Sequence, residues 1–257
     1  MHRNNDAPER PRRTPTCPSP GRCPASKSEL GALLRQSFPS TQASKKWLPI
    51  DKLFELVNPA SVHRELSQTF PSRRLPQDKL EYYTKQVCTY TNYHDVTTGK
   101  PLISSRRCIF AILALMDRVV DAPTFLDSEI WDKDLPVARP DGQGNELISR
   151  GESSTGKISI PKTWNDAAID TFMLYQPYVQ SPFFDLESHN DVPFHELDDD
   201  VALPFTEDDY NQRRQHGHHG TVWRVKIHRA HHNFRPPPVC EPVPYLPLIY
   251  ASNLLSL

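Results

Sequence analysis

The chain has few cysteines, and no two of them lie at the spacing that zinc sites and redox motifs use. The five cysteines are scattered and odd in number, so they predict neither a Cys-x-x-Cys metal site nor a disulfide framework. An excess of charge of one sign is also missing, since 30 lysines and arginines balance 31 aspartates and glutamates. Without a basic excess the chain has no overall attraction for phosphate backbones. We therefore expect reduced thiols, an intracellular location in the cytoplasm or nucleus, and no nucleic-acid partner.

Long hydrophobic runs are absent as well. The longest apolar run, Cys108 to Met116, is far shorter than the roughly 20 residues of a membrane-spanning helix. The first residues, Met1-His-Arg-Asn-Asn, lack the apolar core of a signal peptide, and His2 stands where a myristoylated chain needs glycine. The sequence therefore predicts neither secretion nor a membrane partner.

Proline, in contrast, is abundant, with 26 residues that are densest near the two ends. The first 27 residues mix prolines with arginines and contain hardly any aliphatic side chain. Such a segment cannot bury enough apolar surface to offset the entropy lost on ordering. We predict a disordered, basic, proline-rich tail at residues 1–45. Its Arg12-Arg13-Thr14-Pro15 run is alternatively a phosphorylation site or part of a basic localisation signal.

Apolar residues take up helical spacing from about residue 28 to residue 130. Leu53, Leu56 and Val57 predict one short helix. Asn58-Pro59 then predicts an N-cap followed by proline at the first helical position of a second helix, which Pro71 ends. Later helices are predicted from apolar faces at Leu80, Tyr83, Val87 and Tyr90, and at Phe125, Leu126 and Ile130. We place a helical module at residues 46–133.

The most regular apolar stripe lies in the middle of this module. Its members are Ile109, Ile112, Leu113, Met116 and Val120, and Pro123 is expected to close the helix. A stripe of this width is usually the interior of a bundle, although it also fits a groove for a partner helix. Cys88 and Cys108 lie on the same apolar helices, so we interpret both as small buried residues rather than nucleophiles.

Residues 134–163 are rich in glycine, serine, aspartate and proline, which predicts a polar linker. Within this linker Gly151–Lys157 has the glycine spacing of a phosphate-binding loop. Ile158 replaces the hydroxyl residue of that motif, however, and the required strand and helix are missing. We therefore assign no nucleotide site there.

Residues 164–206 predict a helix followed by an extended segment. The helix begins near Trp164, runs to about Val179, and is stopped by Pro177 and Pro182. The run Asp198–Asp200 is interpreted as a solvated turn rather than a metal site. Together these patterns predict a mostly α N-terminal module, a small and incomplete β region near the C-terminus, and disordered ends. Strands are expected only after Lys157.

A glycine-rich turn then leads into an apolar β-like segment. The run Gln215-His-Gly217-His-His-Gly220-Thr-Val222 resembles the nucleotide-covering loop of a protein kinase, Gly-x-Gly-x-x-Gly-x-Val. Gly217 and Gly220 match the second and third glycines, and Val222 matches the valine that lies against the base. Gln215 stands in place of the first glycine. These three matching residues are the candidate cofactor-binding positions, as a vestigial ATP loop.

The surrounding sequence extends this resemblance. The run from Gly220 to Phe234, preceded by Leu203-Pro-Phe205-Thr-Glu-Asp, is similar to the entry into the kinase domain of uncharacterised filamentous-fungal protein-kinase-like proteins. In those proteins a helical region also precedes the kinase. The resemblance implies a serine/threonine kinase relative, with residues 207–234 as an incomplete N-lobe hairpin. ATP and magnesium are implied only for the full-length family.

The rest of the kinase machinery has no match here. Only 37 residues follow Gly220, and they contain no Ala-x-Lys, His-Arg-Asp or Asp-Phe-Gly motif. Lys226 comes too early after the loop to replace the phosphate-binding lysine. Residues 235–257 predict an irregular proline-rich tail, because each proline removes a backbone donor. We expect a truncated, non-catalytic relative with no catalytic residue and no bound cofactor.

Two other functions stay open at this point. The helical module is alternatively a protein–protein interaction module with a protein partner. A weak metal binder is the other alternative, since six histidines crowd together as His216, His218, His219, His228, His231 and His232, and imidazole is a good ligand for zinc, copper and nickel. No carboxylate or thiolate completes a first shell at a recognisable spacing. We therefore assign no metal site and interpret these histidines as solvated.

Overall fold

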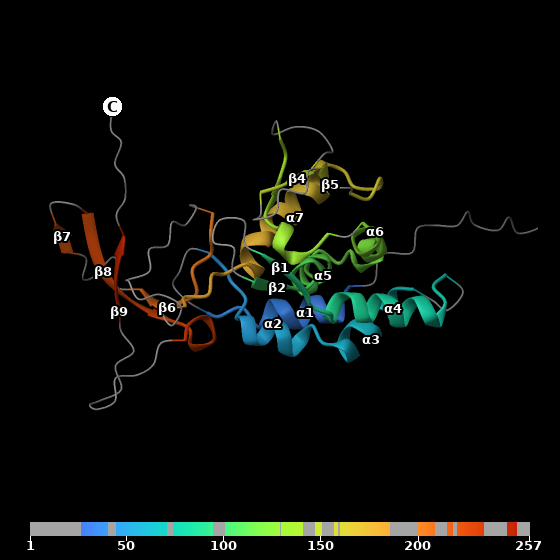
Figure 1. Cartoon of the computed structure of the whole chain (residues 1–257), viewed down its shortest axis with the longest axis horizontal. Helices are drawn as coiled ribbons and strands as arrows, with labels where there is room; N and C mark the ends of the chain where they lie inside the picture. Colours follow the sequence, from blue (N-terminus) through green and yellow to red (C-terminus); the bar gives the residue numbers. More distant parts are fainter. Residues whose placement is uncertain are drawn as a thin grey trace, which may run out of the picture.

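Figure 1 shows the protein as a computed structural model, with a helical part beside a smaller β unit. The structure describes residues 27–40, 45–70, 74–94, 101–128, 130–140, 147–150, 157–158, 160–185, 200–208, 215–217, 220–233 and 246–250. The predicted disordered residues 1–26, the glycine-spaced run at 151–156 and the aspartates at 198–199 lie outside these ranges.

Helices dominate the described chain, as the sequence predicted. The α-helices are α1 (Glu29–Gln36), α2 (Ile50–Leu56), α3 (Pro59–Thr69), α4 (Gln77–Cys88), α5 (Arg107–Leu115), α6 (Ala122–Asp127) and α7 (Asp166–Val179). Short 3-10 turns are η1 (Val119–Asp121), η2 (Asp132–Asp134) and η3 (Arg229–His231). Asn58 caps α3 by accepting the N–H groups of Ala60 and Ser61, as Asn58-Pro59 had predicted. None of these helices is long and apolar enough to cross a bilayer.

The strands form three antiparallel groups. They are β1 (Thr91–His94) with β2 (Pro101–Ser104), β3 (Val137–Ala138) with β4 (Leu147–Ser149) and β5 (Lys157–Ile158), and β6 (Phe205–Asp208), β7 (Gln215–Gly217) and β9 (Leu246–Tyr250) around the central β8 (Gly220–Ile227). The expectation of strands only after Lys157 was wrong, because β1 to β4 precede it. Strands of two to four residues are too short to show an alternating pattern.

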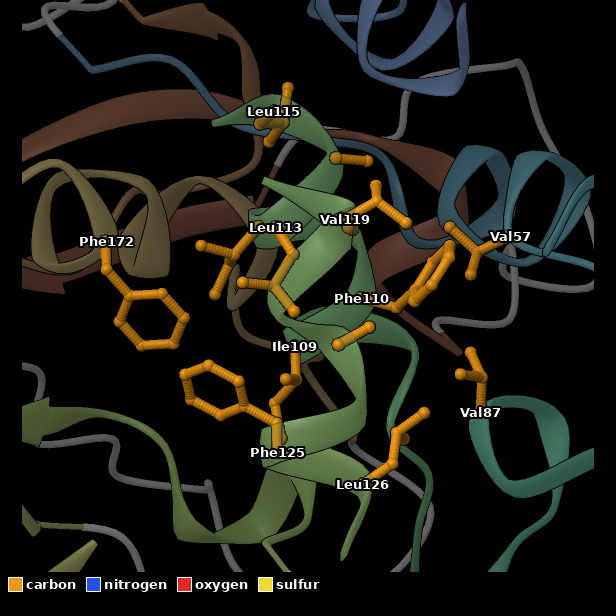
Figure 2. Packing of buried hydrophobic residues seen from close by; sticks show 14 of the residues in the cluster. Val57, Val87, Ile109, Phe110, Leu113, Leu115, Val119, Phe125, Leu126 and Phe172 are labelled. Atoms are coloured by element: carbon orange, nitrogen blue, oxygen red, sulfur yellow. The ribbon is translucent and has the colours of Figure 1, made fainter. Parts of the chain in front are cut away.

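Helix α5 is the centre of the main core. Every side chain from Ile109 to Leu115 is buried. In Figure 2, Phe110 points toward Val57, the residue that caps the C-terminal end of α2. Leu113 points toward Phe172 of α7. Ile109, Ile112 and Leu113 of the stripe are thus bundle interior, and α5 buries its whole circumference, as a helix that is apolar all round does.

The end of α5 differs from the prediction. The helix stops at Leu115, and Asp117 takes the left-handed conformation with φ 55°. The N–H of Arg118 reaches the carbonyl of Leu113 and the N–H of Asp117 reaches that of Ala114, which is the bonding pattern of a Schellman motif. Val120 consequently turns outward and is 51% exposed. Pro123 does not close this helix but lies in the first turn of α6, which begins at Ala122.

Helix α1 corrects the predicted boundary of the tail, which was placed at residue 45. Leu30 and Leu34 of α1 are fully buried in the main core. Ser28 caps the helix through its side chain, and the carboxylate of Asp117 accepts the Ser28 N–H at 2.9 Å. The leucines of α1, Leu30, Leu33 and Leu34, span little more than one helical turn, which gave too short a periodic signal.

Helix α7 and the small sheet belong to this same core. Asn165 caps α7, but Pro177 lies inside the helix rather than stopping it. A proline this near the end removes only a single helical hydrogen bond, so the last residues stay helical. Val137, Leu147 and Ile158 of the three-stranded sheet are buried with the helices. The predicted polar linker at 134–163 is therefore in part a packed sheet.

A second, smaller core holds the C-terminal β unit together. It consists of Phe184, Phe205, Val225 and Ile227 with Leu203 packed against them. The main core ends at Val179, so the break between the two parts falls near residue 180. The predicted division was different, since it placed α7 and the following extended segment together at residues 164–206.

Substitution of Gly31 tests the contact between α1 and α5. A Cβ at Gly31 would lie 2.1 Å from the backbone oxygen of Ala114, and a backbone atom of a buried helix cannot move aside cheaply. Gly31→Ala is expected to destabilise the protein by about 1–3 kcal/mol, the usual cost of overpacking. At an exposed helical site the same change would stabilise by about 1 kcal/mol.

Chemical denaturation of the full chain measures this effect. Leu33→Ala, on the more exposed side of α1, is the control and should change stability much less. A Gly31→Ala protein as stable as the original would show that α1 does not pack on α5 in this way.

Candidate functional site

The glycine turn lies at one end of the C-terminal β unit. Gly217 of β7 pairs with Gly220 of β8, and Val222 pairs with Gln215. The structure therefore brings Gly217, Gly220 and Val222 onto one hairpin, while His218 and His219 at its tip lie outside the described residues. Lys226, further along β8, donates to Glu207 of β6 at 2.9 Å. In Figure 1 the turn end of β7 and β8 lies away from the helices.

Strand β9 corrects the prediction of an irregular tail at 235–257. Thr221 to Val225 of β8 pair with Tyr250 to Leu246. The other side of β8 pairs with β6 and β7. Strand β9 is therefore an edge strand. An edge position tolerates Pro247, because a missing N–H can face outward there.

The other end of the β unit docks on the helical part through His231. This imidazole is 1% exposed. Its Nε2 accepts the N–H of Ile50, the first residue of α2, at 3.0 Å. Its Nδ1 lies 3.0 Å from the carbonyl oxygen of Pro182. Since an N–H only donates and a carbonyl only accepts, the neutral ring with its proton on Nδ1 satisfies both partners.

Trp47 packs against two histidines at this contact. Its ring meets His228 and His231 edge-on, with centroids 5.4 and 5.5 Å away. The helix α2 has no side-chain cap of its own, so His231 supplies a partner for one of the N–H groups that every helix leaves open at its start. We call Trp47, Ile50, Pro182, His228 and His231 the docking cluster.

The docking cluster favours uncharged imidazoles. Burial lowers the pKa of His231, and the neighbouring His228 and His232 lower it further, against the Pro182 hydrogen bond and the charge of Asp51. Burial also lowers the pKa of His228 and of His232. His231 was predicted to be solvated, and this was wrong, because both of its nitrogens are used inside the fold.

Metal binding finds no support in the described residues. No group of three or more histidine, cysteine, aspartate or glutamate side chains gathers at metal-binding geometry there. His231 has no nitrogen left for a metal, since Ile50 and Pro182 occupy both.

Asp132 is a half-buried carboxylate at the start of α5. It accepts the N–H groups of Cys108 and Ile109 and the hydroxyl of Ser105. Burial raises its pKa to about 6, although these hydrogen bonds act in the opposite direction. The carboxylate occupies the anion position at the start of α5, so its arrangement is that of a helix cap.

Burial also affects the thiols of Cys108 and Cys88. Burial, followed by Asp132, raises the pKa of Cys108 well above its usual value. Burial also raises the pKa of Cys88. Both cysteines are half-buried and pack against the main core, and a raised pKa leaves less of the nucleophilic thiolate. A pocket in the main core, lined by Ile109, Phe110, Leu113, Ala122, Phe125 and Leu126, is apolar and has no room for a water molecule.

Arg107 was not singled out by the sequence, yet it is the most unusual charged group described. It is 8% exposed, and its Nε donates to the carbonyl of Val57 at 3.1 Å. Its Nη1 is buried without a partner. Two exposed rings flank the guanidinium, with centroids 5.2 Å away for Phe54 and 4.8 Å for Tyr90. The arginine pair Arg106-Arg107 at the start of an apolar helix was the available signal.

Comparisons of this chain with protein-family models, with curated proteins and with solved structures found no match.

The docking cluster predicts a pH-dependent stability. His231 has a folded pKa below its usual 6.5, so the unfolded chain binds more protons in the window just below pH 6.5. Its contribution is therefore complete above about pH 6.5 and is lost as the pH falls. Asp132 acts in the opposite sense, because its raised pKa stabilises the folded protein below about pH 6.

Comparing variants separates the two effects. His231→Gln should lower stability at pH 7.5 by about 1–3 kcal/mol, as expected for a disturbed buried hydrogen bond, and should flatten the loss between pH 7.5 and 5.5. Denaturant unfolding at each pH measures both, with half-exposed His63→Gln as the control. An unchanged pH profile in His231→Gln would rule out His231 as the titrating group.

Proposed function

We propose that this chain is a non-catalytic relative of the N-terminal part of a serine/threonine protein-kinase-like protein, acting in the cytoplasm or nucleus. Its helical part serves as a scaffold, and its β unit is the opening of a kinase-like N-lobe. The supporting observation is the hairpin in which Gly217 and Gly220 face each other across β7 and β8. The family relation itself rests on the sequence resemblance.

The surroundings of this hairpin favour a non-catalytic role. A phosphate-covering hairpin is one wall of a kinase site, and transfer also needs a lysine for the phosphates, ligands for magnesium and a catalytic aspartate. The sequence has no motif for these groups. Lys226, the lysine nearest the turn on β8, is engaged with Glu207 across the sheet. An open hairpin of this kind cannot bury a nucleotide as binding pockets do.

A second candidate function is a protein–protein interaction module. It is favoured by Phe54 and Tyr90, which are 40% and 47% exposed and lie beside the buried Arg107. Aromatic residues and arginine are the side chains that most often dominate binding energy at protein interfaces.

Nucleotide binding tests the first candidate. Gly217→Val places a side chain where a phosphate would approach the backbone, and in a working kinase loop it would block binding. We expect magnesium-ATP affinity in calorimetry to be equally poor with and without this change, and we expect no phosphate transfer. Lys226→Ala serves as the control for general damage to β8. Saturable magnesium-ATP binding that Gly217→Val abolishes would overturn the proposal.

A further inference from the structure

We propose that Arg107, Phe54 and Tyr90 form a binding site for an acidic side chain, aspartate or glutamate, on a segment of a partner protein. We call these three residues the arginine site. This inference rests on the second proposed function, the interaction module, and specifies what that module binds.

Arg107 carries a charge that no carboxylate of the described residues balances. The guanidinium is almost fully buried, and no carboxylate of the described residues forms an ion pair with it. Buried charges in proteins are normally paired, because removing them from water is costly. The carbonyl of Val57 and the two aromatic faces compensate part of this cost. An anion would complete the compensation.

The guanidinium of Arg107 has one edge left for a ligand. Since Nε is already used by Val57, the free edge of the guanidinium is the one formed by its two terminal nitrogens. A carboxylate binds such an edge with two parallel hydrogen bonds. Nη1, which is buried and lacks a partner, belongs to this edge, so a carboxylate must enter between the Phe54 and Tyr90 rings to reach it.

Neighbouring Arg106 shows that the open edge is a particular property of Arg107. Arg106 is also buried, but its Nε donates to the carbonyl of Ile130 and its Nη1 to the side chain of Gln86. Its guanidinium lies 4.0 Å from the ring centroid of Trp131. The same residue type, one position earlier, is thus satisfied inside the fold.

The rings of Phe54 and Tyr90 indicate which kind of ligand the arginine site takes. Phe54 lies on α2 and Tyr90 lies between α4 and β1, and their rings are 6.4 Å apart while both remain exposed. A small inorganic anion would not contact these rings, whereas a peptide with an apolar residue beside its carboxylate would cover them. Covering the rings would also exclude water from the ion pair, which strengthens it.

Peptide selection tests the site on the full chain. A phage-displayed library of random peptides is selected on the unmodified protein, and the best sequence is synthesised together with an analogue in which Gln or Asn replaces each acidic residue. We expect an acidic residue next to an aromatic or aliphatic one. Loss of the carboxylate should weaken binding in calorimetry by about tenfold or more, the scale of a buried charged hydrogen bond.

Variants locate the binding on the protein. Arg107→Lys keeps the charge but loses the planar fork, and Phe54→Ala and Tyr90→Ala leave the arginine in place, so each should weaken binding by about tenfold, as for residues at the centre of an interface. Tyr82→Ala is the matched control, since Tyr82 is 52% exposed on α4 but packs on Tyr83. Unchanged thermal melting shows that a variant is folded.

Each other outcome overturns the inference. Selected peptides that lack acidic residues, or that bind Phe54→Ala and Tyr90→Ala normally, would leave an interaction module with a different site. Failure to select any peptide would remove the interaction module as well. Displacement of the peptide by millimolar inorganic phosphate alone would assign the site to small anions.

Discussion

The structure depends on the complete burial of helix α5. A buried helix cannot satisfy its terminal N–H and carbonyl groups with water, so protein groups must do so at both ends. At the start, the carboxylate of Asp132 accepts two N–H groups of the first turn. At the end, Asp117 takes the left-handed conformation that closes the helix. Both groups come from outside the helix, and each connects it to another element.

These end groups explain the order in which the elements surround α5. The carboxylate of Asp117 accepts the Ser28 N–H and lies 3.5 Å from Arg35, so the end of α5 holds both ends of α1. Asp132 lies in η2, which leads into the small sheet. Arg107, in the first turn of α5, reaches the carbonyl at the end of α2. The main core is therefore organised by polar contacts at the helix ends as much as by apolar packing.

Sequence reasoning succeeded where the signal was local and failed where it depended on distant contacts. Asn58-Pro59 marked the start of α3 correctly, because a cap acts within a few residues. The end of α5 was missed because aspartate, rather than the usual glycine, holds the left-handed position at residue 117. His231 was judged a solvated residue because its role depends on Ile50, 181 positions away. Arg107 was missed for the same reason, since its two rings lie on other elements. The kinase relation stays a prediction.

Gln176 of α7 has a consequence for how this protein behaves in solution. Its buried amide accepts the N–H of Val137 at 2.6 Å and donates to the carbonyl of Val137 at 3.0 Å. Val137 lies in β3, whose other side already pairs with β4. A side-chain amide thus takes the place that the backbone of another strand would occupy. Open sheet edges are where chains join into aggregates. The Gln176 side chain occupies the free backbone groups of Val137, so it blocks the pairing of another strand at this position.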